Sequence, residues 1–430
     1  MKIAIVGSGI SGLFAASKLH SSHDITLFEA NDYVGGHTHT IRVELDGEVQ
    51  EIDTGFIVYN RENYPEFEKL LTTLAVPSQP TQMSFSVSDS LGSLEYNGTN
   101  LNRLFAQRTN LFRPKFCRMI RDIIQFGRDL KVYMASGHSG VTVEDFIQSK
   151  GYSRLFEDRY LVPLGSALWS CPTATFKKFP IQFVGDFLNN HFMLQVRGRP
   201  KWRVVVGGSS RYVEKLILPF ENRIRKNCPV ASVHRTGHGV KINSRFGTEE
   251  FDHVVLACHA DQALQLLADP SEQEQKHLKL FPYQENQIFL HTDSSVLPKR
   301  KLAWASWNAK IFENTDHPKT VVTYNMNILQ SLKSRHTYCV TLNDSSVIDP
   351  KQVIKSITYH HPLFTVSRQE ALEKQGELLY QNHTSFCGAY WGFGFHEDGI
   401  QSALRVVQAI DQNAAVEPGT VSQQPKRIEL

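Results

Sequence analysis

The 430-residue sequence has no long hydrophobic run, few cysteines and little net charge. No apolar stretch approaches the roughly 18 residues that a membrane-spanning helix requires. The six cysteines contain no C-x-x-C pair, and a chain of this size does not depend on a disulfide framework, so we expect reduced thiols in a cytosol. The formal net charge of +3 implies no general attraction to nucleic acid. We therefore expect a cytoplasmic protein without a nucleic-acid partner.

The motifs of several catalytic classes are absent as well. The sequence has no Ser/His/Asp triad, H-E-x-x-H motif or EF-hand loop, so hydrolase chemistry and a metal site have no support. The length predicts two or three structural units with enough core to fold unaided. The apolar residues 3–6 are followed at once by turn glycines, which is typical of a strand rather than of a secretory signal.

The amino terminus contains the most informative pattern in the chain. Residues 2–6 predict a short buried parallel strand, and a G-x-G-x-x-G motif follows at Gly7, Gly9 and Gly12. Gly7 permits a tight turn, Gly9 lets the backbone approach a pyrophosphate, and Gly12 lets the next helix pack closely on the strand. The pattern therefore predicts a dinucleotide-binding βαβ unit.

The residues after the glycines fit the same unit. A helix is expected to run to Leu19, and its amino terminus, at Ile10 and Ser11, offers free N–H groups and a positive dipole end to phosphates. A strand over residues 25–28 then ends at Glu29, 17 residues after the motif. A carboxylate there can accept hydrogen bonds from a ribose diol, and it disfavours the 2′-phosphate of NADP.

A second glycine pair, Gly35-Gly36, comes soon after Glu29 and indicates another close approach of backbone to a cofactor. With this pair the sequence resembles the flavin-containing amine oxidoreductase superfamily, which includes monoamine oxidases, protoporphyrinogen oxidase and phytoene desaturases. The resemblance implies that the cofactor is FAD and that His37 and Thr38 contact it. His37 stands where many members have an arginine near the pyrophosphate, so this chain departs from the pattern there.

Two further segments carry implied cofactor contacts. A predicted hairpin over residues 41–52 closes just before Gly55 and Phe56. In the resembling superfamily a D-x-G segment at this place passes beside the isoalloxazine ring. Similar proteins also place the backbone of a valine such as Val230 against the adenine.

The carboxyl-terminal part of the chain supplies the other half of the predicted site. A strand ends in a glycine turn, and an aromatic run leads into a helix expected from about Asp398 to Asp411. The resemblance implies that the amino terminus of this helix points at N1 and C2=O of the flavin, where its dipole would stabilise negative charge. The residues with implied cofactor contacts here are Gly388, Glu397, Asp398, Gly399 and Ile400. The residues among which we predict a catalytic base are His396, Glu397 and Tyr390.

A closer resemblance rests on six stretches. They are residues 198–202, 206–213, 258–263, 303–308, 386–390 and 394–399. They resemble a bacterial group of predicted NAD/FAD-binding proteins and the amino-terminal flavin domain fused to plant cyclopropane fatty acid synthases. The resemblance covers residues 1 to about 411, and it implies a link to fatty-acyl methylation with a fatty-acyl methyltransferase as a possible partner. The chain shows no second glycine-rich site for a methyl donor.

The fold class that follows is α/β. We expect a Rossmann-type FAD-binding domain of the GR2, amine-oxidase-like kind, built from discontinuous segments, with an inserted α+β substrate domain that contains a helical part. The FAD-binding domain is expected to comprise residues 1–75, 196–265 and 381–412, and the substrate or cap domain residues 76–195 and 266–380. The polar tail, residues 413–430, is expected to be disordered.

Residues 100–134 form a basic and amphipathic segment. Apolar residues such as Met119 and Ile123 keep helical spacing there, and the acidic residues are only Asp122 and Asp129. The basic residues are Arg103, Arg108, Arg113, Lys115, Arg118, Arg121, Arg128 and Lys131. We interpret the segment either as a cap-domain helix with a solvated basic face or as a contact with an anionic membrane. In the second case the protein would be peripheral at the inner face of the membrane.

The sequence thus predicts an FAD-dependent oxidoreductase. The leading hypothesis is dehydrogenation of an apolar small-molecule or lipid substrate, such as an unsaturated or methyl-branched acyl chain. The predicted substrate domain is rich in aromatic residues, and such side chains can line an apolar tunnel. Amine oxidation, which the name of the superfamily suggests, is one alternative. A non-catalytic FAD-bearing accessory subunit of a fatty-acyl methyltransferase is the other.

Overall fold

The computed structural model describes residues 1–138, 140–169, 171–191, 193–194, 198, 200–312 and 319–414. The helices are α1 (Ile10–Leu19), α2 (Pro65–Thr73), α3 (Leu101–Leu104), α4 (Pro114–Ala135), α5 (Val143–Lys150), α6 (Arg154–Phe156), α7 (Val162–Trp169), α8 (Thr173–Lys177), α9 (Ile181–Asn190), α10 (Ser210–Ile217), α11 (Ala260–Leu266), α12 (Glu272–Leu278), α13 (Met326–Leu329), α14 (Val366–Leu372) and α15 (His396–Ala414). None of the described helices is both long enough and apolar enough to cross a bilayer.

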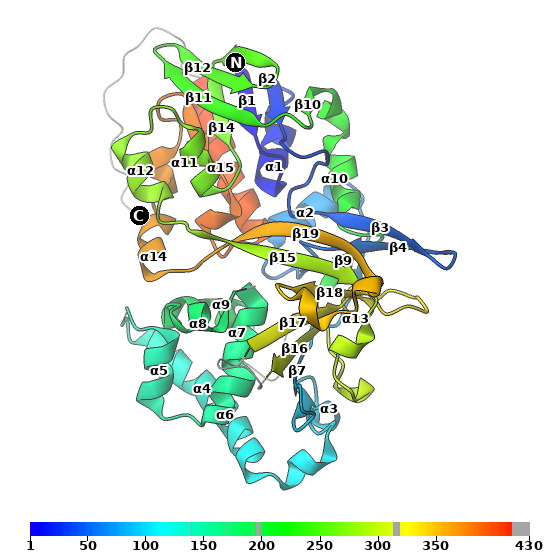
Figure 1. The fold of residues 1–430 in the computed structure, drawn as a ribbon. Helices are drawn as coiled ribbons and strands as arrows, with labels where there is room; N and C mark the ends of the chain where they lie inside the picture. The colour runs from blue at the N-terminus through cyan, green and yellow to red at the C-terminus, as the bar shows by residue number, and fades with distance from the viewer. Residues whose placement is uncertain are drawn as a thin grey trace.

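A parallel sheet organises the upper body of the molecule (Figure 1). Its strands, in spatial order, are β10 (Ile224–Arg225), β2 (Asp24–Phe28), β1 (Lys2–Val6), β14 (His253–Leu256) and β20 (Thr384–Phe386). These strands come from three distant parts of the chain, and each lies in one of the ranges expected for the FAD-binding domain. The α/β fold class with a Rossmann-type sheet is therefore confirmed.

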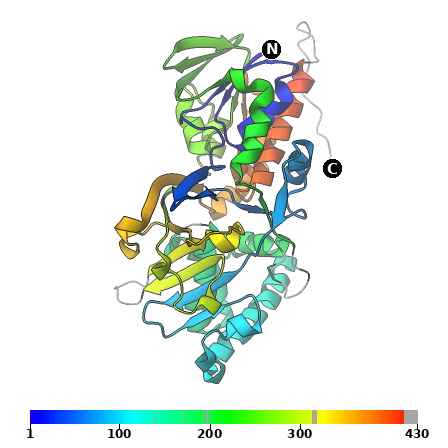
Figure 2. The same cartoon turned by 90° about the vertical axis from the view of Figure 1, so that its right-hand side faces the viewer.

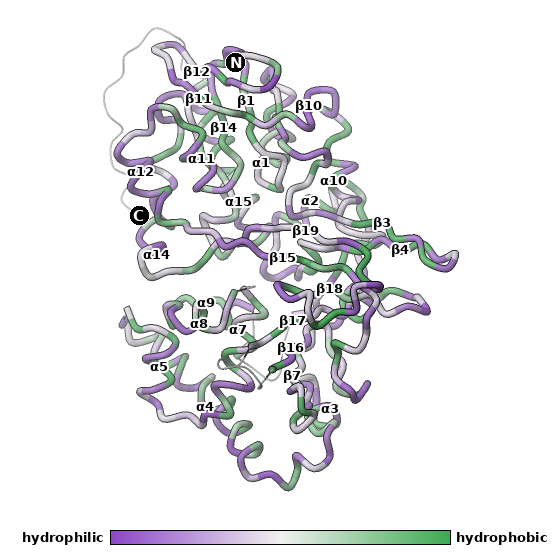
Figure 3. Tube along the Cα trace, in the orientation of Figure 1, coloured by the Kyte–Doolittle hydropathy of each residue, from purple (hydrophilic) through white to green (hydrophobic). Residues whose placement is uncertain are grey.

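The two faces of β1 pack against different layers, because successive side chains of a strand point to opposite sides. Ile3 and Ile5 pack with residues of α1, α10 and α15. Ala4 and Val6 pack with α11 and with an antiparallel sheet of β11 (Val230–Thr236), β12 (Gly239–Ser244) and β13 (Gly247–Phe251). Figure 2 shows α1 and α15 side by side. Figure 3, coloured by hydropathy, shows that β1 and β14 are hydrophobic strands between the layers.

A hairpin extends from this body, as the sequence predicts. Its strands are β3 (Thr40–Leu45) and β4 (Glu48–Asp53). Asp46 and Gly47 form the turn with φ angles of 49° and 77°, the left-handed values that a two-residue turn between antiparallel strands requires.

The lower body combines a mixed sheet with helices. The strands of the sheet, in spatial order, are β19 (Val353–Pro362), β15 (Tyr283–His291), β18 (Cys339–Leu342), β17 (Lys319–Asn325), β16 (Trp307–Phe312), β7 (Phe85–Asp89) and β8 (Glu95–Asn97). Side chains of β7 and β16 share a hydrophobic core with α4 to α9. The long strands β15 and β19 run along the junction between the two bodies (Figure 1). The α+β character and the helical part match the expected substrate domain.

Several boundaries differ from the sequence predictions. Residues 251–258, which read as β-strand in the sequence, contribute to two strands in different sheets, because the chain turns at Asp252, whose carboxylate accepts the N–H of Lys2 at 2.6 Å. Strand β6 (Ser78–Pro80) lies just beyond the expected boundary at residue 75 and pairs with β9 (Arg203–Val205), which also pairs with β5 (Val58–Tyr59). Helix α15 starts two residues earlier than expected and runs to Ala414, so the first two residues of the expected tail are helical. Residues 415–430 lie outside the described residues.

Candidate functional site

The glycine-rich loop joins β1 to α1 at the carboxyl end of the parallel sheet. Gly7 has a φ of 106°, and a Cβ on it would lie 2.8 Å from the carbonyl oxygen of Ala257. A Cβ on Gly12 would lie 2.0 Å from the carbonyl oxygen of Gly7. A Cβ on Gly9, in contrast, would meet nothing within 4 Å. Two of the three glycines are thus required by packing inside the protein, whereas Gly9 faces open space beside the first turn of α1.

The first turn of α1 carries free backbone donors. The N-cap residue is Gly9, which offers no side chain to bond them, and there is no acidic residue in the first turn. The first N–H groups of a helix, here at Ile10 and Ser11, have no acceptor within the helix. Together with the helix dipole they form a place that suits a phosphate group.

Glu29 holds the glycine loop in place. Its Oε2 accepts hydrogen bonds from the N–H of Ser8 at 3.0 Å and from the hydroxyl of Ser8 at 2.5 Å. Its Oε1 accepts the backbone and side-chain N–H groups of Asn31 at 2.8 and 2.9 Å. A carboxylate accepts about four hydrogen bonds, so a ribose diol would share these oxygens by displacing the Ser8 hydroxyl or the Asn31 amide. Val230 begins β11 close by, since the N–H of Cys228 donates to the carbonyl oxygen of Glu29 at 2.7 Å.

The second glycine pair packs directly on the first loop. The N–H of Gly35 donates to the carbonyl oxygen of Ser8 at 3.1 Å, and a Cβ on Gly36 would lie 3.0 Å from the Cα of Gly9. On the other side of this segment, the N–H of Phe56 donates to the carbonyl oxygen of His37 at 2.8 Å. A Cβ on Gly55 would lie 2.1 Å from the same oxygen. The first glycine loop, the segment 35–37 and the segment 55–56, all predicted to contact the cofactor, therefore pack on one another.

Asp53 holds the neighbouring segments in place through hydrogen bonds. Its buried Oδ1 accepts hydrogen bonds from the hydroxyls of Thr40 and Ser209 and from the N–H of Ser209, at 2.6 to 2.8 Å. Its Oδ2 accepts the side-chain amide of Gln330 at 3.0 Å. Burial raises the pKa of Asp53 to about 6, although these donors oppose the shift. The carboxylate thus ties the hairpin to both bodies of the molecule.

The closing segment brings the two ends of the chain together. Gly388 follows β20, and its N–H donates to the hydroxyl of Ser402 at 2.9 Å. A Cβ on Gly399 would lie 2.8 Å from both the Cγ2 of Ile10 and the Oγ of Ser11, so the first turns of α15 and α1 touch. Two helix amino termini, each a positive dipole end, therefore converge beside the glycine loops.

Comparison with known proteins decides what this geometry serves. A family model described as flavin containing amine oxidoreductase matches residues 10–339. The chain belongs to that family. It is an FAD-dependent oxidoreductase, and the glycine loops and helix termini are the candidate site for its flavin.

Solved structures share the fold of this flavoprotein at low identity. Cyclohexylamine oxidase from Brevibacterium oxydans IH-35A is 13% identical with a TM-score of 0.68, over 96% of this chain and 99% of that chain. A CLA-producing fatty acid isomerase from P. acnes is 14% identical with a TM-score of 0.64, over 94% and 97% of the two chains. A 4,4′-diapophytoene desaturase of Staphylococcus aureus is 44% identical over 43 residues, which are 10% of this chain and only 9% of the desaturase.

The residues present fit FAD. The open space at Gly9 and the free N–H groups at Ile10 and Ser11 suit the diphosphate, and Glu29 and Val230 lie together at the end of β2 for the adenosine part. Helix α15 lies at the other end of the site. The carboxylate of Asp398, in its first turn, accepts the N–H of Phe395 at 2.9 Å, and burial raises the pKa of Asp398 to about 6. Ile400, the next residue of that first turn after Gly399, is fully buried against α1 and β1.

The three residues predicted to include a base each have a structural partner. The Nε2 of His396 lies 3.0 Å from the Oγ1 of Thr38 and 2.9 Å from the hydroxyl of Tyr212, and its ring stacks on Phe56 with the centroids 3.5 Å apart. Burial holds the pKa of His396 well below its usual value, so the ring is neutral. Thr38, which is predicted to contact the cofactor, is buried and hydrogen-bonded to both Tyr212 and His396.

Glu397 and Tyr390 have partners outside the glycine loops. The carboxylate of Glu397 accepts the backbone N–H groups of Glu66 and Phe67 at 3.3 and 3.1 Å, and it thereby caps α2. Tyr390 is buried against Phe281 and Trp391, and burial raises the pKa of its hydroxyl. The geometry assigns capping to Glu397 and packing to Tyr390.

A histidine cluster, which sequence reasoning missed, covers the second glycine pair. The ring centroid of His37 lies 6.1 Å from that of His259 and 5.3 Å from that of His361. His259 stacks on Tyr283 at 4.3 Å. Burial lowers the pKa of His37 to about 4 and that of His259 and His361 to about 3, so all three rings are neutral at neutral pH. The Nε2 of His37 is buried and has no hydrogen-bond partner among the described residues.

A chain of hydrogen bonds fixes the tautomer of His361. The N–H of Gln287 donates to the Oδ1 of Asn343, which leaves the Asn343 amide nitrogen to donate to the Oδ1 of Asn286. The amide nitrogen of Asn286 then donates to the Nδ1 of His361 at 2.8 Å. A neutral imidazole with Nδ1 as acceptor carries its proton on Nε2. His361 therefore presents an N–H donor through Nε2.

Proposed function

We propose that the protein dehydrogenates an apolar substrate of the class of an unsaturated or methyl-branched fatty acyl chain. The observation that supports this proposal most directly is a set of aromatic side chains that connects the closing motif to the helical part of the substrate domain. The half-buried end of this set, at Phe393 and Phe395, can offer apolar contact to a hydrocarbon chain, and the other rings are buried behind it.

The aromatic set begins just before α15. Phe395 stacks on Phe187 of α9 with centroids 5.5 Å apart, and Phe393 lies 5.5 Å from Phe183 of the same helix. Phe183 in turn stacks on Phe364 at 4.2 Å. Phe393 and Phe395 are half-buried, and they lie just before the helix terminus that is predicted to close the flavin site.

The residues of the site divide the work of a dehydrogenation. FAD, when bound, supplies the chemistry by accepting a hydride. The amino terminus of α1 holds the diphosphate, and the amino terminus of α15 favours negative charge beside it. His361 offers an N–H donor, and the aromatic set orients an apolar chain and excludes water. The sequence predicts a base for the second proton among His396, Glu397 and Tyr390. Because Glu397 caps α2 and Tyr390 is packed in the core, His396 is the candidate that the variants below test first.

The named relatives support more than one substrate class. The fatty acid isomerase and the 4,4′-diapophytoene desaturase support an apolar substrate, and cyclohexylamine oxidase supports an amine. We favour the apolar substrate because of the aromatic set. The link to fatty-acyl methylation, with a methyltransferase partner, rests on the sequence resemblance and is part of the proposal.

Anaerobic titration of the purified holoprotein tests the proposal. Two panels are compared: phospholipids with unsaturated or methyl-branched chains, and amines that include cyclohexylamine and putrescine. We expect the visible absorbance of the flavin to bleach with an acyl lipid, with a product two hydrogens lighter by mass spectrometry. Bleaching by an amine alone would establish the amine oxidase instead.

Variants refine the same measurement. His396→Gln is titrated beside the unaltered protein, with Glu397→Gln as a comparison. Loss of bleaching in His396→Gln alone, with flavin still bound, identifies His396 as the base, and loss in Glu397→Gln alone identifies Glu397. If no substrate reduces the flavin while a methyltransferase co-purifies stoichiometrically, the accessory-subunit alternative replaces the proposal.

A further inference from the structure

The end of the molecule opposite the flavin site exposes apolar and basic side chains together. We call this region the basic tip; it comprises α3, the short 3₁₀ helix η1 (Arg108–Phe112) and the first turns of α4, and it lies at the bottom of Figure 1. Phe112 is 83% exposed, Leu111 55% and Leu101 75%. Large apolar side chains exposed so near one another in the chain mark an interaction surface rather than ordinary scatter.

Basic side chains surround the exposed apolar residues. Arg108, Arg113 and Lys115 lie next to them in sequence and are exposed. Arg118, Arg121, Arg128 and Lys131 follow along the exposed side of α4, together with Ile124 and Val132. The opposite side of α4 is buried through Phe116, Met119, Phe126 and Leu130. The structure therefore shows the predicted amphipathic helix, and its polar side is almost purely cationic.

The two acidic side chains of the basic segment are bonded to other groups. The acidic residues of the segment are Asp122, which is buried and accepts the N–H of Ser153, and Asp129, which accepts the hydroxyl of Tyr152. Among the residues that the structure describes, no carboxylate lies within ion-pairing distance of these cations. The positive charge is therefore available to a partner.

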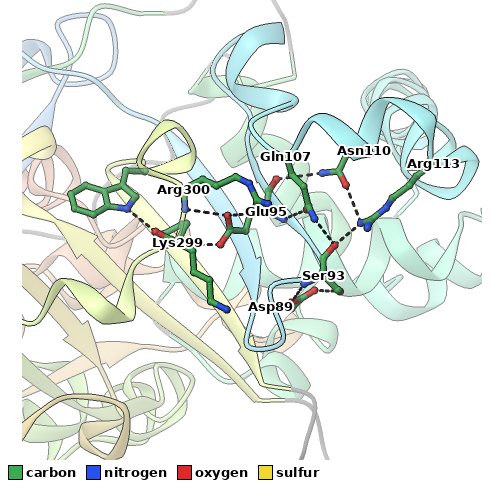
Figure 4. A network of polar contacts seen from close by, with 10 residues as sticks. Asp89, Ser93, Glu95, Gln107, Asn110, Arg113, Lys299 and Arg300 are labelled. Atoms are coloured by element: carbon green, nitrogen blue, oxygen red, sulfur yellow. Dashed lines mark hydrogen bonds and ion pairs between the residues drawn. The ribbon is translucent and has the colours of Figure 1, made fainter.

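A network of buried polar contacts holds the tip rigid (Figure 4). Glu95, which is 1% exposed, accepts the N–H groups of Lys299 and Arg300 and the guanidinium of Arg300. Gln107 bonds the N–H of Glu95 and the carbonyl oxygen of Ser93. Asn110 bonds the carbonyl oxygen of Glu95, and Arg113 bonds Asn110 and the carbonyl oxygen of Ser93. Residues 107 to 113 are thus anchored on both sides of Leu111 and Phe112, which remain exposed on a fixed scaffold.

We propose that the basic tip docks the protein on an anionic phospholipid bilayer. Phe112 and Leu111 insert between the headgroups, and the surrounding arginines and lysines bind lipid phosphates. Apolar residues at the centre and cations around them are what interfacial membrane contacts require, since apolar burial and attraction to anionic lipids act together.

A bilayer fits this surface better than the other polyanions. Nucleic acid is bound mainly through phosphate contacts and by base edges or stacked bases. The tip exposes two leucines beside its phenylalanine, and such aliphatic side chains suit the acyl region of a bilayer. The proposal concerns a surface remote from the flavin and holds whichever substrate the flavin oxidises, so its failure and that of the proposed function are distinguishable.

Vesicle sedimentation with the full-length holoprotein tests the docking. Vesicles of phosphatidylglycerol with phosphatidylethanolamine are compared with vesicles of phosphatidylcholine alone. We expect binding to the anionic vesicles only, and we expect it to weaken when ionic strength rises from about 0.1 M to about 1 M, because the screening length falls from about 10 Å to about 3 Å.

Two variants and two matched controls locate the contact. The double variant Leu111→Ser with Phe112→Ser and the charge reversal Lys115→Glu, Arg118→Glu, Arg121→Glu should each reduce vesicle partition by about tenfold or more. Phe246→Ser, an exposed phenylalanine of the β12–β13 turn, and Lys276→Glu, Lys279→Glu, Lys333→Glu, which changes net charge equally elsewhere, should leave it unchanged.

Three outcomes would overturn the proposal. They are no binding to anionic vesicles, equal loss in variants and controls, and binding to RNA or DNA that needs the cations but not Phe112 in a protein that ignores vesicles. Flavin content and melting temperature, measured for every variant, show that the remote site is intact.

Discussion

The first turns of α15 and α1 are in contact through Gly399 and Ser11, since a Cβ on Gly399 would lie 2.8 Å from the Oγ of Ser11. A Gly399→Ala variant must therefore separate the two helix termini. We expect it to lose bound FAD and to be less stable by about 1–3 kcal/mol, the usual cost of overpacking. The flavin-to-protein ratio and urea unfolding measure this. Gly376→Ala is the control, because a Cβ there meets nothing within 4 Å; equal losses in both variants would contradict the role of the contact.

Substitution of Gly9 and substitution of Gly12 by alanine should have different effects on stability and on FAD binding. A Cβ on Gly9 meets no protein atom, so Gly9→Ala should fold with nearly unchanged stability and bind FAD at least tenfold more weakly, because the methyl group stands where the diphosphate approaches. A Cβ on Gly12 would lie 2.0 Å from the carbonyl oxygen of Gly7, so Gly12→Ala should lose stability and FAD together. Unfolding of the apoproteins separates the two effects. Normal FAD affinity in Gly9→Ala would place the phosphates elsewhere.

His37 should make FAD binding depend on pH. Burial lowers the pKa of His37 to about 4 in the absence of an anion. A nearby diphosphate favours the protonated ring and raises that pKa. Binding then takes up protons, so affinity should rise as pH falls, by at most about tenfold per pH unit for one proton, and become constant below about pH 4.

Fluorescence titration of the apoprotein with FAD between pH 5 and 8 measures this dependence. His37→Arg should bind FAD tightly, and His37→Gln should bind FAD weakly. In both variants the affinity for FAD should not depend on pH in this range. His234→Gln, at a histidine outside the site, should keep the slope. A slope that persists in His37→Gln would assign the proton to another group.

Glu397 should contribute to stability rather than to turnover. Its carboxylate accepts the N–H groups of Glu66 and Phe67 at the start of α2. Loss of such a cap costs about 0.5–2 kcal/mol. Glu397→Ala should lower the unfolding free energy by that amount, while flavin reduction per bound FAD stays within about twofold. A drop in the reduction rate with unchanged stability would restore Glu397 as a catalytic candidate.

Buried histidines should make the protein sensitive to mild acid. Burial lowers the pKa of His253 to about 3 and that of His291 to about 4, and both rings are fully buried. The unfolded chain takes up protons near pH 6.5 and the folded chain does not, so this stability is complete above pH 6.5 and is lost as pH falls toward 4. Asp53 has the opposite sign, because its pKa is raised to about 6. From pH 7 to pH 5 the loss should reach about 2 kcal/mol for each fully buried histidine.

Urea unfolding at the two pH values measures this loss. His253→Gln should show a shallower pH dependence, whereas His238→Gln, at an exposed position, should behave like the unaltered protein. An identical pH dependence in His253→Gln would mean that this histidine is protonated in the folded chain.

Sequence reasoning succeeded where the determinants are local. Gly7, Gly9 and Gly12 lie within six residues of one another. Their spacing alone predicts the tight turn of the loop and the close packing of the next helix on the strand. The turn at Asp46-Gly47 is equally local, since only certain residues accept its φ angles.

Sequence reasoning failed where distant segments supply each other's partners. His37 lies in a loop, His259 is the N-cap residue of α11, and His361 lies at the end of β19. Only the fold places the rings of His259 and His361 within about 6 Å of His37. Glu397 lies 331 residues from the backbone group that it caps, so nothing near it in the sequence distinguishes a cap from a base. The pair Cys258-His259 at a strand end was the one available signal of the cluster.

The two helices that converge at the glycine loops, α1 and α15, lie almost 400 residues apart in the chain. The glycine loops are therefore synthesised long before α15, and the predicted flavin site stays incomplete until the chain beyond residue 396 has left the ribosome. A product truncated before residue 396 should accumulate as a colourless, protease-sensitive species even though its phosphate-binding motif is intact.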